Sequence, residues 1–320
     1  MGANFFDKDL QESYDVIILG GGPAGCTAGM YAARDALSTL ILERNMPGGN
    51  VAITELVENY PGIIEPIEGY KLSDQFLEHA EKFGAVCRQG NCIKVELDGD
   101  DKVLTLDDGR ILRCKALIIS TGSIAKKTGA KNEDKFIGRG VSFCATCDGG
   151  FFRNKEVIVV GGGDSALEEG MYLTKFASKV IIVHRRNEFR AAKIIQQRAK
   201  ENEKIEFLTP YTIDEIIGDQ IITSVKLRNK ETDEVIERKI DGVFEFIGWN
   251  ANTEIFKDII ELSDGGFIVA GEDTKTSVPG IFAAGDVRKK GLMQIVTAAS
   301  DGAIAAKNAE HYINEDLKNK

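Results

Sequence analysis

The stretch that decides the fold reads YDVIILGGGPAG and covers residues 14–25. Its first half is a short apolar run, which is typical of a strand buried on both faces in a parallel sheet. Its second half has the spacing G-x-G-x-x-G, and a helical pattern follows at Cys26–Asp35. A strand that leads through such a turn into a helix predicts an open α/β fold with a dinucleotide site at the turn.

Each glycine of this turn has a separate physical role. Gly20 makes the tight turn, Gly22 lets the backbone approach a pyrophosphate, and Gly25 lets the helix pack on the strand. The N-terminus of the helix then holds the phosphate charge. A second strand at Thr39–Leu42 ends in Glu43, which is placed to accept hydrogen bonds from ribose hydroxyls. A Gly-rich turn without a ligand is the alternative, and the complete strand–helix–strand–acid pattern disfavours it.

A second motif of the same kind occurs at residues 157–166, which read VIVVGGGDSA. A helix is expected at Leu167–Phe176 and a strand at Val180–Val183. This strand ends in His184-Arg185-Arg186, with Arg190 one helical turn further on. An acid here would favour NAD, whereas arginines favour the 2′-phosphate of NADP. A solvated basic stretch is the alternative, but it gives no reason for arginines at the end of this particular strand.

Between the two motifs lies CATCD, residues 144–148. Cys144 and Cys147 can close a small disulfide or open to a dithiol in which one thiol is unusually acidic. Asp148 follows directly and is placed to give or take a proton. A zinc site would need two more ligands, and no second pair at zinc-ligand spacing is found among the three histidines and the remaining cysteines, Cys26, Cys87, Cys92 and Cys114. The spacing therefore favours a redox pair.

Polar stretches at Lys126–Lys135 and Trp249–Asn252 are expected to be connectors. Between them, short apolar runs at Ile205–Phe207, Ile221–Leu227 and Val235–Ile240 are expected to form a small hairpin insert.

After the second connector the chain returns to the first pattern. Ile281–Asp286 is a strand that ends in an acid, and Gln294–Tyr312 has the period of an amphipathic helix. We therefore expect an α/β protein with two Rossmann-like dinucleotide-binding domains, the second inserted into the first. The first domain would comprise residues 1–124 and 251–320, and the second residues 125–250.

The composition excludes several classes of protein. The chain of 320 residues is 43% hydrophobic and 28% charged, which is typical of a soluble globular protein of about two domains. Its net charge of -10 argues against a nucleic-acid binder. Six cysteines do not make a secreted disulfide framework. No apolar run reaches the length of about 18 residues that a membrane span needs, and residues 1–13 do not resemble a signal peptide, so we expect a cytoplasmic enzyme.

From Tyr14 to Tyr312 the chain resembles the low-molecular-weight, bacterial-type thioredoxin reductases. The resemblance rests on Gly20 to Gly25, Pro47-Gly48-Gly49, CATCDG at residues 144–149, Gly161 to Ala166 with Glu168-Glu169, His184-Arg185-Arg186 with Arg190, and Gly285-Asp286-Val287. It implies FAD in the first domain, NADPH in the second, a homodimer, and thioredoxin or a thioredoxin-like protein as the substrate.

The resemblance also assigns roles to residues. Cys147 would face the flavin, Cys144 would attack the partner, and Asp148 would be the acid–base. Asp286 would bind the ribityl or pyrophosphate part of FAD. The residues that would bind FAD are Gly20, Gly22, Pro23, Ala24, Gly25, Glu43, Arg44, Gly48, Gly49, Asn50, Asn59, Gly285, Asp286, Met293, Gln294 and Ile295. Those that would bind NADPH are Gly161, Gly163, Asp164, Ser165, Ala166, Arg185, Arg186 and Arg190.

The chain departs from the family pattern at a few positions. The family usually has Gln where Asn50 stands and Arg where Met293 stands. Its second connector usually contains His and Pro, where this chain has Trp249 and Ala251. None of these positions is one of the reacting groups, Cys144, Cys147 and Asp148.

Two other functions remain open from the sequence. One is a related flavoprotein disulfide reductase fed by ferredoxin or flavodoxin, against which the arginine cluster argues. The other is a flavin-binding redox sensor whose disulfide is regulatory and does not turn over.

Overall fold

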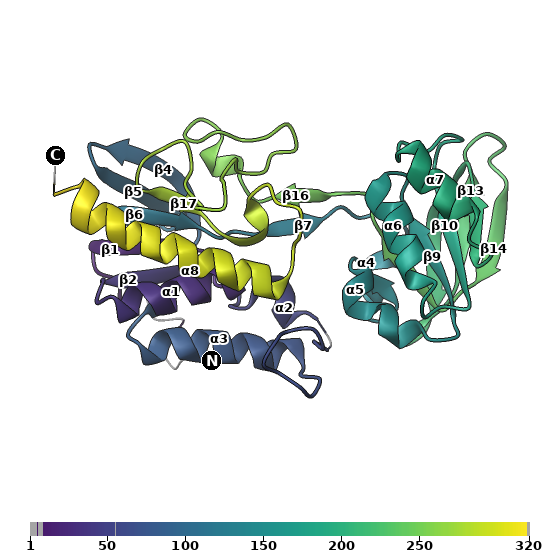
Figure 1. Cartoon of the computed structure of the whole chain (residues 1–320), viewed down its shortest axis with the longest axis horizontal. Helices are drawn as coiled ribbons and strands as arrows, with labels where there is room; N and C mark the ends of the chain where they lie inside the picture. Colours follow the sequence, from purple (N-terminus) through teal and green to yellow (C-terminus); the bar gives the residue numbers. More distant parts are fainter. Residues whose placement is uncertain (1–4, 6–8, 55, 319–320) are drawn as a thin grey trace. The chain divides into compact units, whose positions relative to one another are not determined.

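The computed structural model describes residue 5 and residues 9–54 and 56–318. Its contacts divide the chain into two units: the first unit (residues 1–124 and 250–320) and the inserted unit (residues 125–249). Figure 1 traces the chain through both. Among the described residues, no helix has both the length and the apolar character needed to cross a bilayer.

The described part of the first unit contains a seven-stranded sheet in the order β3-β2-β1-β6-β5-β4, with β17 also paired to β6. The strands are β1 (Ser13–Leu19), β2 (Thr39–Glu43), β3 (Val86–Gln89), β4 (Cys92–Asp98), β5 (Asp101–Leu106), β6 (Ile111–Ile119) and β17 (Ile281–Ala283). All pairs are parallel except those made by β4 and β5. In β1, Val16, Ile17 and Ile18 are fully buried, because both faces of the sheet are covered. This explains why the strand reads as a continuous apolar run.

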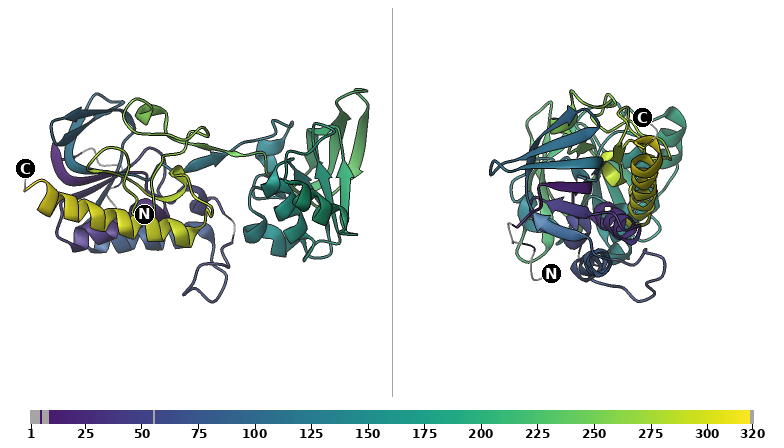
Figure 2. Two further views of the ribbon diagram at one scale, coloured as in Figure 1. Left: turned by 45° about the horizontal axis from the view of Figure 1, so that its top comes forward. Right: turned by 90° about the vertical axis from the view of Figure 1, so that its left-hand side faces the viewer.

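Helices cover one face of this sheet, as Figure 2 shows for α1 and α8. They are α1 (Pro23–Arg34), α3 (Gly69–Lys82) and α8 (Ile295–His311), with the short α2 (Gly49–Ala52) beside α3. Small residues let α8 lie close to α1: a Cβ at Gly302 would be 2.2 Å from the carbonyl oxygen of Ala24. The other face packs on Phe256 of η2 (Glu254–Phe256), Ile260 and Ile268.

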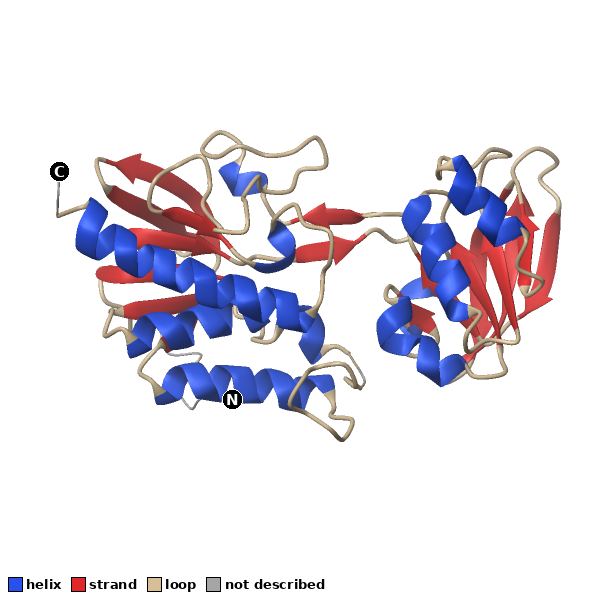
Figure 3. Cartoon of the chain, in the orientation of Figure 1, coloured by secondary structure: helices blue, strands red, loops and turns tan. Residues whose placement is uncertain are grey.

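The inserted unit has its own parallel sheet, in the order β11-β10-β9-β15-β8. Its strands are β8 (Val141–Ser142), β9 (Glu156–Val160), β10 (Lys179–Val183), β11 (Ile205–Leu208) and β15 (Gly242–Glu245). Its helices are α4 (Glu133–Phe136), α5 (Ala145–Asp148), η1 (Gly149–Phe152), α6 (Asp164–Leu173) and α7 (Lys193–Lys200). Figure 3 distinguishes these helices from the strands.

A three-stranded antiparallel sheet packs against one face of this parallel sheet. Its strands are β12 (Tyr211–Gly218), β13 (Ile222–Asn229) and β14 (Val235–Lys239). The expectation that Ile205–Phe207 belongs to this hairpin insert is wrong, because those residues pair in parallel with β10. The first strand of the insert is β12.

Two short strands at the boundary of the units, here called the connectors, form a sheet of their own. The second lies within the expected connector Trp249–Asn252, whereas the expected first connector, Lys126–Lys135, begins only after this sheet and belongs to the inserted unit. The two strands are β7 (Ser123–Ala125) and β16 (Trp249–Ala251). Backbone bonds flank them on both sides, from Lys126 N to Gly248 O (2.9 Å) and from Asn252 N to Gly122 O (3.1 Å). The expected fold class is confirmed: two Rossmann-like α/β units, the second inserted into the first.

Candidate functional site

The turn between β1 and α1 separates its glycines into two kinds. A Cβ at Gly20, which has φ +106°, would lie 2.3 Å from the carbonyl oxygen of Ser120, and one at Gly25 would lie 1.9 Å from that of Gly20. Both positions therefore exclude any side chain. A Cβ placed at Gly22 would meet only the Cα of Gly49, at 4.0 Å, among the described residues outside its own turn. The backbone at Gly22 is open to a ligand.

A second Gly-rich segment lies against this turn. The amide of Gly48 donates to the carbonyl oxygen of Gly21 (2.8 Å). The Glu43 carboxylate, at the end of β2, accepts from the amides of Gly21 (2.8 Å) and Asn45 (2.9 Å). Glu43 thus holds the turn in place, and each of its oxygens keeps a lone pair for a further donor. Arg44 beside it is exposed.

Asp286 follows β17, within η3 (Gly285–Val287). A Cβ at Gly285 would lie 2.9 Å from the Cβ of Ala24, so this segment abuts the start of α1. The Asp286 Oδ1 is buried and has no hydrogen-bond partner among the described residues. Burial raises the pKa of its carboxyl, although the charge of Lys290 opposes this. A buried polar atom without a partner is costly, so this oxygen suits a ligand that brings a hydroxyl.

A buried ion pair that the sequence did not reveal fixes this segment. Arg288 donates to both carboxylate oxygens of Asp301 on α8, at 2.8 Å each. Lys290 and the amide of Gly285 also donate to Asp301, each at 2.9 Å. Burial raises the pKa of Asp301, but the bonds from Arg288 and Lys290 outweigh it and hold the pKa below its usual value. An acid in an otherwise Ala-rich helix was the available signal.

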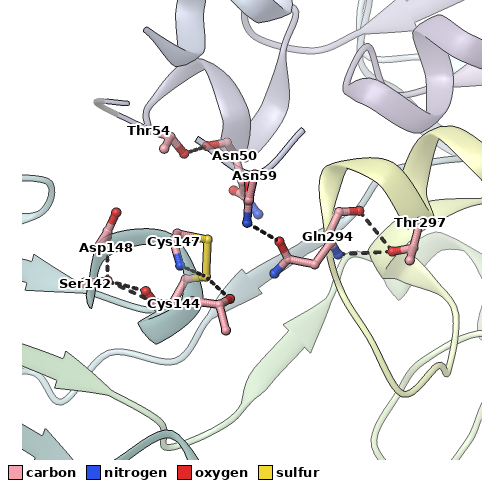
Figure 4. The surroundings of a disulfide bond; sticks show 10 residues. Asn50, Thr54, Asn59, Ser142, Cys144, Cys147, Asp148, Gln294 and Thr297 are labelled. Atoms are coloured by element: carbon pink, nitrogen blue, oxygen red, sulfur yellow. Dashed lines mark hydrogen bonds between the residues drawn. A yellow bond between two sulfur atoms is a disulfide. The ribbon is translucent and has the colours of Figure 1, made fainter. Parts of the chain in front are cut away.

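The N-terminus of α8 is capped by Gln294. The backbone amide of Gln294 donates to Thr297 Oγ1 (3.1 Å), and the Gln294 side chain accepts from the backbone amide of Thr297. Its Oε1 also accepts from Asn59 Nδ2 (3.1 Å), a residue 235 positions away in the chain. Figure 4 draws these bonds. The structure thus brings Asn59 and Gln294 together, with Met293 and Ile295 on either side of Gln294.

Asn50, on α2, makes a different contact. Its Nδ2 donates to the carbonyl oxygen of Ser123, the first residue of β7 (3.1 Å). The amide therefore ties the segment after Gly49 to the connector.

The second Gly-rich turn, between β9 and α6, repeats the division of roles. A Cβ at Gly161 would lie 2.5 Å from that of Ala166, whereas a Cβ at Gly163 would have no atom of the described residues outside its own turn within 4 Å. The amide of Arg190 donates to the carbonyl oxygen of Gly162 (2.7 Å). Asp164 Oδ1 accepts from the amide of Ala192 (2.7 Å), with Ser165 exposed next to it. The turn and the arginine segment are therefore held together.

The side chains of Arg185, Arg186 and Arg190 are exposed after β10. His184, which directly precedes them, is buried and stacks on Phe189 with ring centroids 5.2 Å apart. Burial lowers the pKa of His184, and the neighbouring arginine charges lower it further. The histidine is thus a neutral packing residue, which the sequence did not indicate.

Cys144 and Cys147 form a disulfide, with Cα atoms 5.3 Å apart, so the predicted pairing is confirmed. Cys144 caps α5, and its Sγ accepts from the amide of Cys147 (3.2 Å). The Asp148 carboxylate lies 2.6 Å from the hydroxyl oxygen of Ser142 (Figure 4). Ser142 was not among the residues that the sequence singled out.

Comparisons with known proteins agree with these features. The family described as pyridine nucleotide-disulphide oxidoreductase matches residues 14–302. A thioredoxin reductase of Bacillus subtilis is 49% identical over 306 residues, covering 95% of this chain and 96% of that protein. One of Listeria innocua is 47% identical and covers 95% of each. The crystal structure of thioredoxin reductase from Streptococcus pyogenes has a TM-score of 0.90 at 43% identity, covering 97% of this chain and 100% of the other.

Proposed function

The chain belongs to the pyridine nucleotide-disulphide oxidoreductase family, and we propose that it is an NADPH-dependent thioredoxin-disulfide reductase that carries FAD. It would reduce the disulfide of thioredoxin or a thioredoxin-like protein. The observation that carries the proposal is the Cys144–Cys147 disulfide, followed directly by Asp148, in the unit that also holds the second Gly-rich turn and the arginine cluster. The relatives named thioredoxin reductase support the choice of substrate.

The first unit fits FAD. The open backbone at Gly22 suits a pyrophosphate, and Glu43 suits ribose hydroxyls. The buried oxygen of Asp286, which has no partner in the part of the chain that the structure describes, suits a hydroxyl of the ribityl chain. Gln294 and the N-terminal dipole of α8 would lie at the flavin ring. When bound, FAD supplies a two-electron carrier between a nicotinamide and a disulfide.

The inserted unit fits NADPH. The backbone at Gly163 is open where α6 begins, so a pyrophosphate can approach the helix N-terminus. Arg185, Arg186 and Arg190 supply the charge that a 2′-phosphate requires. These arginines favour NADPH over NADH, and they also argue against a reductase fed by ferredoxin or flavodoxin.

The two cysteines carry out the exchange. Two electrons and two protons open the Cys144–Cys147 bond to a dithiol. The proton of the Cys144 thiol passes to Asp148, and the Cys144 thiolate attacks the partner disulfide, so that one S–S bond forms as another breaks. The leaving thiolate then takes that proton from Asp148. The Cys147 thiolate next attacks Cys144, which restores the internal disulfide and releases the second partner thiolate for protonation. The dithiol is oxidised and the partner disulfide is reduced, with both electrons accounted for.

The assembly that we propose is a homodimer, and the location is the cytoplasm. Gel filtration of the purified protein tests the first statement. A monomer at micromolar concentration would contradict it.

The function itself is tested with purified protein, NADPH or NADH, and a panel of thioredoxins. We expect a yellow protein that oxidises NADPH in the presence of thioredoxin disulfide and turns over repeatedly. Cys144→Ser and Cys147→Ser should each abolish thioredoxin reduction, whereas Cys92→Ser, at a free cysteine of the first unit, should not. A single equivalent of thiol without turnover would indicate a redox sensor, and failure of NADPH to bleach the flavin would indicate another electron donor.

A further inference from the structure

Ser142 lies where the chain enters the dithiol segment. It is the last residue of β8, its side chain is buried, and it pairs with Phe244 of β15 in the parallel sheet. Its position is therefore fixed by a strand, whereas Asp148 is the last residue of the single-turn helix α5.

The hydroxyl of Ser142 has two possible acceptors and one proton. The Asp148 Oδ2 lies at 2.6 Å, and the carbonyl oxygen of Cys144 lies at 3.3 Å. A hydroxyl bonded to a carboxylate is typically that short, and such bonds are about twice as strong as neutral ones. The proton therefore points to Asp148.

The hydroxyl oxygen of Ser142 also accepts a hydrogen bond from the backbone amide of Cys144, at 3.1 Å. The result is a continuous chain of donors from the Cys144 amide through Ser142 to the Asp148 carboxylate. Asp148 in turn donates its amide to the carbonyl oxygen of Cys144 (3.2 Å). One hydroxyl thus joins the backbone of one cysteine to the acid next to the other.

We propose that Ser142 is a positioning residue for the thiol chemistry, holding the Asp148 carboxylate in a fixed orientation on the turn that carries Cys144 and Cys147. This inference rests on the proposed function. Donation to the carboxylate favours its charged form, so Ser142 makes Asp148 a stronger acid. Transfer of the thiol proton to and from Asp148 depends on the orientation of its carboxylate, which this bond fixes.

Other titratable groups near α5 also contribute to a pH profile, and their contributions must be distinguished from that of Asp148. Among the elements that pack against α5, α6 carries Asp164, Glu168, Glu169 and Tyr172, and η1 carries none. The two thiols of the reduced pair titrate as well. The Asp148→Asn background identifies which part of a pH profile belongs to Asp148.

The test compares Ser142→Ala with Ser142→Thr, which keeps the hydroxyl, by the pH dependence of kcat/KM for thioredoxin disulfide. We expect Ser142→Ala to lower kcat/KM about tenfold. In the plot of kcat/KM against pH, the limb that reports the ionisation of Asp148 should move upward by about one pH unit. Ser142→Thr should restore the limb. In the Asp148→Asn background, Ser142→Ala should cost less than about twofold, because its target is gone.

Ser224→Ala is the matched control. Ser224 is also buried in the inserted unit, and its hydroxyl also donates to a carboxylate, Glu237, at 2.7 Å. Its removal should leave the pH profile in place. An unshifted limb in Ser142→Ala, or an equal loss in the Asp148→Asn background, would overturn the proposal.

A second readout needs no turnover. Infrared titration of the Asp148 carboxylate, with the Asp148→Asn spectrum subtracted, should give a higher pKa in Ser142→Ala than in the unchanged protein. If NADPH and thioredoxin are not substrates, the proposed function fails, while this titration still reports whether Ser142 acts on Asp148.

Discussion

The carboxyl groups of Glu133 and Glu245 hydrogen-bond each other in the interior of the inserted unit. Both also accept from Thr128: its hydroxyl donates to Glu133 (2.9 Å) and its backbone amide donates to Glu245 (3.2 Å). Burial, followed by the presence of Glu133, raises the pKa of Glu245 to about 8. Glu245 ends β15, and Thr128 follows the connector β7, so the pair ties the start of the unit to its sheet.

This pair predicts a stability that falls as pH rises. Between the usual value of 4.5 and about 8, the folded state keeps a proton on Glu245 that the unfolded state has lost. The contribution of this group is fully present below the lower value and declines by about 1.4 kcal/mol per pH unit across the window. Glu245→Gln keeps a donor toward Glu133 and should flatten this slope. Urea unfolding at about pH 5.5 and about pH 8.5 measures it.

Glu234→Gln, an exposed carboxylate of the same unit, serves as the control and should leave the slope unchanged. Equal slopes for Glu245→Gln and the unchanged protein would refute the prediction.

The ion pair of Asp301 with Arg288 predicts a large loss on substitution. Asp301→Asn removes the carboxylate that accepts hydrogen bonds from both Arg288 and Lys290, which should cost roughly 3–5 kcal/mol of unfolding free energy. In the unchanged protein, this contribution is present above the usual pKa of 3.8 and is lost as pH falls through the lowered pKa. Urea unfolding of Asp301→Asn and of the unchanged protein gives the difference in unfolding free energy. The control Asp264→Asn, at an exposed position, should change this free energy little. A loss below about 1 kcal/mol would show that the pair is dispensable.

Two glycines of the first turn predict opposite results for the same substitution. Gly25→Ala should prevent folding, because its Cβ would lie 1.9 Å from a carbonyl oxygen. Gly22→Ala should fold normally, because its φ is -79° and its nearest neighbour is 4.0 Å away. It should nevertheless lower FAD affinity about tenfold or more, since the methyl group occupies the space of the pyrophosphate. Circular dichroism and flavin content after dialysis check both. A folded Gly22→Ala that retains its flavin would exclude this turn as the FAD site.

The arginine cluster predicts a change in cofactor preference. Arg185→Gln combined with Arg186→Gln should raise KM for NADPH about tenfold or more and leave KM for NADH nearly unchanged, because only the former has a 2′-phosphate. Steady-state kinetics with both cofactors measure the ratio. Arg198→Gln, an exposed arginine on α7, is the control. Parallel changes in both KM values would point to a structural effect.

The sequence predicted those features that depend on local spacing. The strands β1 and β9 and the two Gly-rich turns were found because their apolar runs and glycines lie within a dozen residues of each other. The bonds of Asn59 to Gln294 and of Arg288 to Asp301 join distant segments, and no local pattern reports them. The assignment of Ile205–Phe207 failed because a short apolar run does not indicate whether its partner is parallel or antiparallel.

The pairing of β7 with β16 has a consequence for how this protein can be dissected. Since the chain enters and leaves residues 125–249 through adjacent strands, the ends of that segment are neighbours. A short Gly-rich turn could replace the whole segment and leave a continuous flavoprotein fragment. The excised piece could likewise be expressed alone, or grafted into a surface loop of an unrelated host.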